Sequence, residues 1–276
     1  MNDDSLAEKE RLLKEIVGDL SLVAVAFSGG VDSSLLLAVC ADVLGADRVL
    51  ALTADSPLLP RVELAMARQV ASLLGVEHRT LALDELARPE IRANPPDRCY
   101  YCKQMRFSAL LAMRESAMPD RVLVHGENAD DSLDYRPGSR AAAELGVRAP
   151  LAEAGLTKAE IRELSRRRGL PTSDLPAEAC LATRFPSGTE LTAEGLARVE
   201  RAEVALHRIL GQGRLRVRDH FPVARIEIPE QSIEAAVRAP LRQEIVTAVT
   251  KAGYRYVAID LMGYRMGSMN DRVTAR

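Results

Sequence analysis

Short apolar runs alternate with amphipathic stretches through the first half of the chain. The pattern predicts strands at residues 22–27, 48–53, 77–83, 121–125 and 147–151, with helices between them at 32–44, 60–74 and 102–117. Strands separated by helices of this length form βαβ units. We therefore expect an α/β fold built on a doubly wound parallel sheet of about five strands.

The pattern changes in the second half. A capping box at Thr157–Glu160 predicts a helix that ends at Gly169. Residues 172–190 show no period, which is more typical of a working loop than of a spacer. After Thr192 the sequence predicts a helix, strands at 214–220 and 223–228, a helix at 232–251 and a strand at 255–261. We expect a first domain over 1–190 and a smaller α+β domain over 191–276.

The segment Ser28–Ser33 directly follows the first predicted strand and leads into a helix. Gly29 and Gly30 let the backbone approach an anion closely, and the hydroxyls of Ser28 and Ser33 add donors. The unpaired N–H groups of the helix start attract negative charge. The segment predicts a phosphate-binding turn, although no Lys follows the glycines as in a Walker A loop. The alternative is a glycine turn without a ligand.

Two other polar segments follow predicted strands and should line the same crevice, because ligands of such sheets lie beyond the carboxyl ends of the strands. They are Ala54-Asp55-Ser56, and the segment 126–131, which contains Asn128, Asp130 and Asp131. Together with Asp32, the two aspartates of the second segment could hold Mg²⁺ on a leaving pyrophosphate. As loop carboxylates they could equally cap helices.

Composition and charge limit the classes of partner. The formal net charge is −2, only 4% of the residues are aromatic and there is no Trp, so we expect no nucleic-acid partner. The start of the chain lacks the basic region of a signal peptide, and no apolar run is long enough to span a bilayer. We expect no membrane association and a cytoplasmic location.

Four cysteines are too few for a disulfide scaffold in a chain of 276 residues. Cys40 falls in an apolar helix pattern and is expected in the core. Cys99 and Cys102 follow a turn-rich stretch, 94–98, that is expected to be a loop. Their spacing lets two thiolates share one metal, although a single pair is only half a zinc site. With Cys180 as third ligand, they would suit a [4Fe–4S] cluster with one open iron. The alternative is two incidental cysteines at a helix start.

Cationic side chains accompany two of these features. Arg184 follows Cys180 in the non-periodic loop, and a nearby cation favours the thiolate, so Cys180 could also be a nucleophile or sulfur donor. Arg214, Arg216 and Arg218 alternate along a predicted strand and should share one face. Aligned like charges suggest a bridging anion, but a solvated edge strand is equally compatible with the spacing.

The Ser-Gly-Gly-x-Asp-Ser sequence resembles the pyrophosphate loop of the N-type ATP pyrophosphatases. Three further stretches, 126–138, 176–184 and 263–270, resemble the LarE family of ATP-dependent sulfur transferases, which acts in nickel-pincer nucleotide cofactor synthesis. The resemblance implies that ATP and Mg²⁺ are used to adenylylate a carboxylate of pyridinium-3,5-biscarboxylic acid mononucleotide. Pyrophosphate would leave, and sulfur would then replace AMP to give a thiocarboxylate.

The resemblance also assigns roles to individual residues. Family members with a single cysteine matching Cys180 sacrifice its sulfur, whereas this chain resembles the branch in which three cysteines, here Cys99, Cys102 and Cys180, hold a [4Fe–4S] cluster. Sulfide or another sulfur source would then be transferred repeatedly. The resemblance places Arg216 and Arg218 in the family's binding site for the substrate phosphate. It also implies a homo-hexamer.

Two rival functions remain at this point. A tRNA-thiolating pyrophosphatase would need a basic face interleaved with aromatic residues, which the sequence does not show. A nucleotide-binding regulatory module would use the glycine turn but would have no use for Cys99, Cys102 and Cys180. Pyrophosphate release and tRNA binding distinguish these possibilities.

Overall fold

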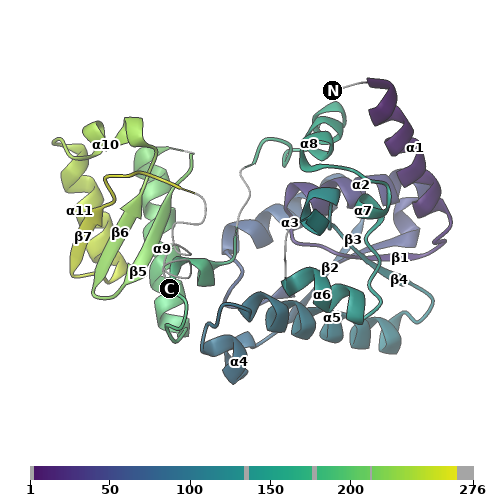
Figure 1. The fold of residues 1–276 in the computed structure, drawn as a ribbon, viewed down its shortest axis with the longest axis horizontal. Helices are drawn as coiled ribbons and strands as arrows, with labels where there is room; N and C mark the ends of the chain where they lie inside the picture. The colour runs from purple at the N-terminus through teal and green to yellow at the C-terminus, as the bar shows by residue number, and fades with distance from the viewer. Residues whose placement is uncertain (1–2, 134–136, 176–178, 212, 266–276) are drawn as a thin grey trace. The chain divides into compact units, whose positions relative to one another are not determined.

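The computed structural model describes residues 3–133, 137–175, 179–211 and 213–265, which form two compact units. The first unit holds the described residues of 3–84 and 97–175, and the second holds those of 85–96 and 179–265. Figure 1 labels the elements of each. Residues 134–136, 176–178 and 266–270, which belong to the three stretches compared above with a known family, lie outside the described residues.

The first unit contains a parallel four-stranded sheet in the order β3-β2-β1-β4. The strands are β1 (Val23–Ala26), β2 (Val49–Asp55), β3 (Glu77–Ala82) and β4 (Val122–His125). The helices are α1 (Asp3–Gly18), α2 (Val31–Leu44), α3 (Arg61–Leu73), α5 (Arg98–Ala117), α6 (Pro137–Glu144), α7 (Pro150–Glu153) and α8 (Lys158–Arg167), with short 3₁₀ turns at Ala46–Arg48 and Ala129–Leu133.

Helices cover both faces of this sheet because its strands are apolar on both sides. Val23 and Val25 of β1 face a core shared with α1, α2, α3, α7 and α8. Ala24, between them, faces the opposite side, where Phe107 and Leu110 of α5 pack. A strand buried on both faces is typical of a doubly wound sheet. The predicted α/β architecture is confirmed.

The expected fifth strand at 147–151 is wrong. Residue Arg148 forms a single parallel bridge with Val124. Pro150 then begins α7, because a proline at the first helical position lacks only an N–H that has no partner in the helix. The apolar run thus enters the core as a turn and a short helix.

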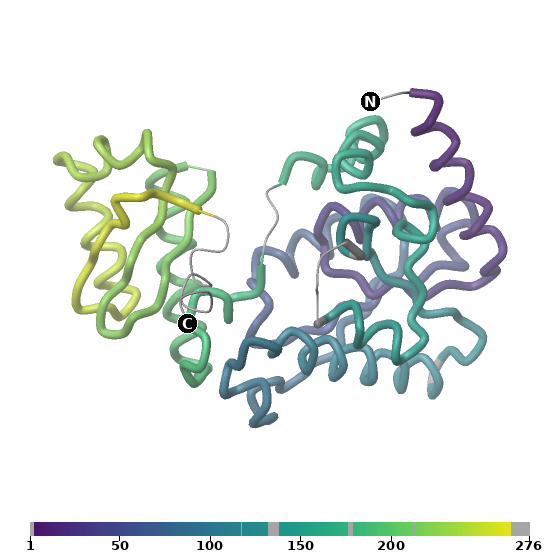
Figure 2. The backbone as a smooth tube through the Cα atoms, viewed as in Figure 1, coloured from purple at the N-terminus to yellow at the C-terminus, as the bar shows by residue number. Residues whose placement is uncertain are grey.

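Helix α1 was not predicted. It lies beside α2 and α8 (Figure 2), and Lys9 forms an ion pair of 2.8 Å with Glu160 of α8. Glu160 also accepts from the backbone N–H of Thr157, while the Thr157 hydroxyl accepts from the N–H of Glu160. The capping box predicted for this helix is therefore confirmed, and its glutamate also ties α1 to α8.

The second unit contains a three-stranded sheet in the order β5-β6-β7, with β5 and β6 antiparallel and β6 and β7 parallel. Its elements are β5 (Arg216–His220), β6 (Val223–Glu227), β7 (Tyr256–Ile259), α4 (Pro89–Arg92), α9 (Ala193–Leu210), α10 (Glu230–Ala236) and α11 (Leu241–Ala252), with 3₁₀ turns at Glu85–Ala87 and Leu181–Arg184. The single helix predicted at 232–251 is two helices. Pro240 separates them because it cannot donate a helical hydrogen bond.

Residues 85–96 leave the first unit and fold with the second. The Asn94 side chain donates to the carbonyl of Pro186 at 3.0 Å, and the carbonyl of Asn94 accepts from the N–H of Gly188. The carbonyl of Arg92 accepts from the N–H of Leu191 at 2.8 Å. The chain therefore passes between the units three times. The domains predicted over 1–190 and 191–276 stay a prediction. The contacts within the chain group residues 85–96 and 179–190 with the second unit.

In the part of the chain that the structure describes, no helix combines the length and the apolar character that crossing a membrane requires.

Candidate nucleotide and thiol sites

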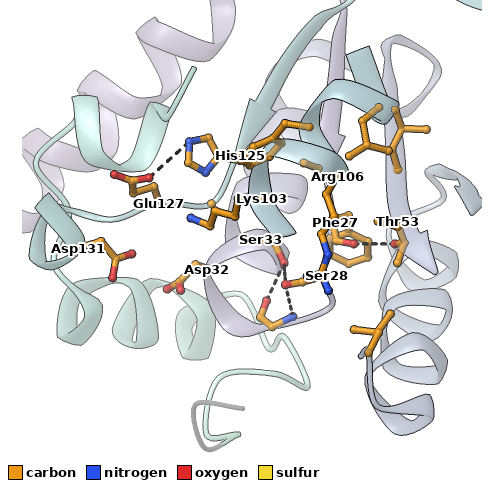
Figure 3. A pocket seen from close by; sticks show the side chains of 18 residues that line it. Phe27, Ser28, Asp32, Ser33, Thr53, Lys103, Arg106, His125, Glu127 and Asp131 are labelled. Carbon is orange, nitrogen blue, oxygen red and sulfur yellow. Dashed lines mark hydrogen bonds and ion pairs between the residues drawn. The ribbon is translucent and has the colours of Figure 1, made fainter. Parts of the chain in front are cut away.

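A cavity of about 230 Å³ opens at the carboxyl ends of β1, β2 and β4 (Figure 3). It is lined by Ala26, Phe27, Ser28, Gly30, Asp32, Ser33, Leu52, Thr53, Ala54, Leu59, Lys103, Arg106, Phe107, Leu110, His125, Gly126, Glu127 and Asp131. The lining combines serine hydroxyls and charged groups with aliphatic and aromatic side chains. Such a mixture suits a ligand with a flat apolar group and an anionic tail.

The turn between β1 and α2 has the form that the sequence predicts. The hydroxyls of Ser28 and Ser33 are 3.1 Å apart, and the N–H of Gly30 donates to the Ser28 hydroxyl. Gly29 has a φ of +80°, and a Cβ there would lie 2.9 Å from the backbone nitrogen of Ala67. The start of α2 has no side-chain cap, so its first N–H groups are oriented for an anion.

Asp32, in the first turn of α2, pairs with a lysine that the sequence did not indicate. Lys158 Nζ lies 2.5 Å from Asp32 Oδ2. Burial raises the pKa of the Asp32 carboxyl, as does the charge of Asp131, while Lys158 acts in the opposite direction. The other carboxylate oxygen, Oδ1, is buried without a hydrogen-bond partner. An orphaned buried oxygen beside a second carboxylate is consistent with a cation site.

The other predicted pocket residues divide into two kinds. Ala54 lines the cavity. Asp55 instead pairs with Arg61 at 2.5 Å, and the Ser56 hydroxyl accepts from the N–H of Leu58. Asp55 and Ser56 therefore shape the turn into α3.

The 126–131 segment is also partly structural. The side-chain oxygen of Asn128 accepts from the N–H groups of Asp130 and Asp131 at 3.0 and 3.3 Å. Asp130 accepts from the N–H of Lys158 at 2.8 Å and so caps α8. Asp131 lines the cavity and is the carboxylate placed to act with Asp32.

Two cationic pocket residues, Lys103 and Arg106, were missed by the sequence reasoning. Both come from α5 and line the cavity together with Phe107 and Leu110. The spacing 103, 106, 107, 110 is that of one helix face. This spacing, directly after the cysteine pair, is the signal that could have indicated them.

His125, at the end of β4, is neutral. Burial is the main cause that lowers its pKa to about 3, and the positive charge of Lys103 adds to this effect. Its Nε2 lies 3.6 Å from Glu127, and its ring packs edge-on against Phe107. The neutral imidazole therefore acts here as a packed side chain beside the cavity.

The four cysteines have different surroundings. Cys40 is buried in α2, and burial raises the pKa of its thiol to about 12, as expected for a core residue. Cys99 is exposed and Cys102 is buried. Both lie in the first turn of α5 and not in a loop, and Arg98 Nη2 lies 3.7 Å from the Cys99 sulfur. The half-buried Cys180 belongs to the second unit. Within the described residues, no three Cys, His, Asp or Glu side chains form a metal-binding group.

Arg184 interacts with the backbone of the Cys180 turn. Its Nε and Nη2 donate to the two oxygens of Glu203, each at 3.0 Å. Its Nη1 donates to the carbonyls of Ala179 and Cys180. Glu203 also accepts from the N–H of Val217 at 2.9 Å. Arg184 therefore fixes the backbone on which Cys180 lies.

Arg216 and Arg218 of β5 are buried, and carboxylates of the same unit lie beside this strand. Arg218 donates to Glu227 at 2.9 and 2.7 Å and to the carbonyl of Thr183 at 3.0 Å. Arg225 pairs with Glu227 and with Asp260. Arg216, which begins β5, lies over the Tyr264 ring at 5.7 Å. Arg214 precedes the strand. Arg218 and Arg225 are therefore both paired with carboxylates of the second unit.

Comparison with known proteins adds to this geometry. The family model for NAD synthase matches residues 7–97, which include β1, the phosphate turn and β2. An uncharacterized protein of Synechocystis is 42% identical, with 98% of this chain and 99% of the relative covered. An uncharacterized protein of Methanocaldococcus jannaschii is 30% identical over 88% of this chain and 90% of its own length.

A relative with a named activity covers nearly the whole chain. The pyridinium-3,5-bisthiocarboxylic acid mononucleotide synthase of Lactiplantibacillus plantarum is 39% identical, covering 98% of this chain and 96% of the relative. The two sequences therefore align over nearly their full lengths, which include both units of this chain. This chain belongs to the LarE family of ATP-dependent sulfur transferases, within the N-type ATP pyrophosphatase superfamily.

Proposed function

We propose that this protein uses ATP to convert carboxylates of pyridinium-3,5-biscarboxylic acid mononucleotide into thiocarboxylates. The observation that carries the proposal is the pyrophosphate turn at Ser28–Ser33, open at the carboxyl end of β1, in a chain 39% identical to a named synthase. The same turn alone would support only ATP cleavage.

The first step is adenylylation. A substrate carboxylate oxygen attacks the α-phosphorus of ATP, the bond to the bridging oxygen breaks, and pyrophosphate leaves. Asp32 and Asp131 are the carboxylates that would hold Mg²⁺, which neutralises charge on the leaving pyrophosphate. The Ser28 and Ser33 hydroxyls and the α2 N–H groups are placed to bind phosphate oxygens. Lys158 holds Asp32 from the side of α8.

The second step replaces AMP by sulfur. Hydrosulfide attacks the acyl carbon, the bond to the phosphate oxygen breaks, AMP leaves and the thiocarboxylate remains, with one proton released. Cys99, Cys102 and Cys180 are the thiols that would hold a [4Fe–4S] cluster, and such a cluster would supply the sulfide. The first two, three residues apart in one helical turn, fit a shared centre. Consumption of the Cys180 sulfur is the competing source.

The substrate phosphate is proposed to bind beside Arg216 and Arg218. This role is supported by the positions of Arg216 and Arg218, which alternate along β5 and therefore lie on the same face of its sheet. A pre-paired guanidinium such as Arg218 is held in place and need not be ordered when an anion arrives. A homo-hexamer is proposed with the same family assignment and is tested by light scattering.

The decisive experiment incubates the anaerobically reconstituted protein with ATP, sulfide and the substrate. We expect pyrophosphate release that requires substrate, and a product whose mass rises by that of sulfur minus oxygen. Asp32→Asn should abolish pyrophosphate release, whereas Cys40→Ser, in the core and outside the cavity, should retain it. Pyrophosphate release stimulated by tRNA in place of the substrate would contradict the proposal.

The same reaction distinguishes the sulfur sources. Unchanged protein mass after several turnovers supports transfer through the three thiols. Loss of one H₂S per chain after a single turnover indicates that Cys180 is consumed.

A further inference from the structure

Helix α5 presents one continuous stripe of side chains to the nucleotide cavity. Lys103, Arg106, Phe107 and Leu110 line the cavity, and they are spaced at three and four residues. Cys102 lies four residues before Arg106 and so occupies the same stripe one turn earlier. The helix therefore carries cationic groups of the cavity and a thiol on one face.

The two cations point to different parts of the cavity. In Figure 3, Lys103 extends toward the side lined by Asp32, Glu127 and Asp131, whereas Arg106 extends past Phe27 toward Ser28. The lining also contains aliphatic side chains, among them Leu52, Ala54 and Leu59, which suit a nucleobase. Arg106 therefore extends from a partly apolar lining toward the Ser28–Ser33 turn.

The side chain of Lys103 passes close to a glycine. A Cβ on Gly138 of α6 would lie 2.7 Å from Cδ and 3.0 Å from Cε of Lys103. The lysine chain therefore runs directly over the backbone of α6, and a larger residue at position 138 would require it to move.

We propose that Arg106 binds the α-phosphate of the nucleotide, first in ATP and then in the acyl-adenylate, and that Lys103 binds the pyrophosphate part. The assignment rests on the proposed function. The α-phosphate joins the nucleoside to the phosphates bound at the start of α2, so it must lie where the apolar lining meets the turn. A guanidinium can donate two parallel hydrogen bonds to non-bridging phosphate oxygens.

Binding at Arg106 also places the reacting carbon near α5. One turn of helix separates Arg106 from Cys102, a rise of about 6 Å. When hydrosulfide attacks the acyl carbon, the C–O bond to AMP breaks and its electron pair moves to the phosphate oxygen. The phosphate charge then changes from −1 to −2. Hydrogen bonds from Arg106 strengthen as this charge develops, so Arg106 accelerates departure of AMP as well as binding it.

The test measures binding of AMP and of adenosine to the full chain by calorimetry. Arg106→Gln should weaken AMP binding by about 10- to 100-fold, the loss expected for hydrogen bonds to a charged group, and should change adenosine binding by less than about twofold. Lys103→Gln should weaken pyrophosphate binding but leave AMP binding within about threefold. Arg114→Gln, the same change two turns along α5 and outside the cavity lining, is the matched control.

The outcomes are distinguishable. Equal losses for AMP and adenosine in Arg106→Gln would show that Arg106 packs on the base, and an unchanged AMP affinity would show no phosphate contact; either overturns the inference. If the wild-type protein binds neither AMP nor ATP, the proposed function fails instead. Should Arg106→Gln not fold, Arg106→Lys keeps the charge but loses the planar pair of donors. It should bind AMP more weakly than the wild type, and wild-type AMP affinity in that variant would overturn the inference.

Discussion

The buried pair between Arg184 and Glu203 allows a quantitative test of how the Cys180 turn is held. Arg184 is 1% exposed, and Glu203 accepts two hydrogen bonds from it and a third from the N–H of Val217. Glu203→Ala leaves the guanidinium buried without its counter-ion. Breaking such a pair costs about 3–5 kcal/mol. Because a whole domain is stabilised by only about 5–15 kcal/mol, the second unit should lose much of its stability.

The half-buried Cys180 thiol reports on this unit directly. Pulsed alkylation at increasing urea concentrations, read by mass spectrometry, gives the midpoint at which Cys180 becomes accessible. With a typical slope of about 1–3 kcal/mol per M, the midpoint of Glu203→Ala should fall by about 1–5 M. Replacing both partners, Arg184→Met with Glu203→Leu, should recover most of the loss, since no charge is then left buried.

Glu234→Ala is the matched control, because Glu234 and Arg238 form an ion pair in the same unit with 77% and 72% of their side chains exposed. It should cost less than about 1 kcal/mol. If Glu203→Ala costs no more than Glu234→Ala, the reasoning that Arg184 positions the Cys180 backbone is refuted.

Three further predictions follow from the first unit. Gly126→Ala should abolish ATP binding in equilibrium dialysis, because its Cβ would lie 2.8 Å from the backbone nitrogen of Ser33, whereas Gly146→Ser, with open space around it, should bind normally despite its positive φ. The neutral His125 has a folded-state pKa below its unfolded value of 6.5, so its contribution is present above pH 6.5 and is lost as pH falls toward 3, by at most about 1.4 kcal/mol per pH unit; urea titrations of His125→Gln should show a shallower loss, and identical slopes would contradict this. Thr157→Ala should lower the melting temperature through loss of about 1 kcal/mol of capping, and an unchanged value would mean that Asp130 alone caps α8.

The sequence was sufficient for those features that local patterns determine. Strand and helix periods predicted the doubly wound sheet, and the Ser28–Ser33 segment predicted a tight turn between β1 and α2, because both depend on neighbouring residues. The prediction of a fifth strand was wrong because an apolar run of this length also fits a buried turn. Here Pro150 begins a short helix instead.

Features that depend on tertiary partners were not predictable. Glu203 is one acidic residue of an amphipathic helix, and nothing in its neighbourhood indicates that it is buried against Arg184. The pairing of Arg218 with Glu227 of the neighbouring strand is set by strand register, which the sequence alone does not show. Lys103 and Arg106 are an intermediate case, because the sequence shows that they share one helix face but does not show that α5 packs with this face toward the sheet.

The threefold passage of the chain between its units has a practical consequence for anyone who dissects this enzyme. A fragment that starts at residue 179 would lack Arg92 and Asn94. The carbonyl of Pro186 would then lose its donor, and the N–H groups of Gly188 and Leu191 would lose their acceptors. A fragment that stops before residue 179 would still carry residues 85–96, but without the unit against which they fold. Glu85, which is fully buried in the whole chain, would then be exposed to water. We therefore expect each half to fold poorly when it is expressed alone. A single proteolytic cut near residue 179 should leave the two parts associated, because residues 85–96 would still be folded with the second unit.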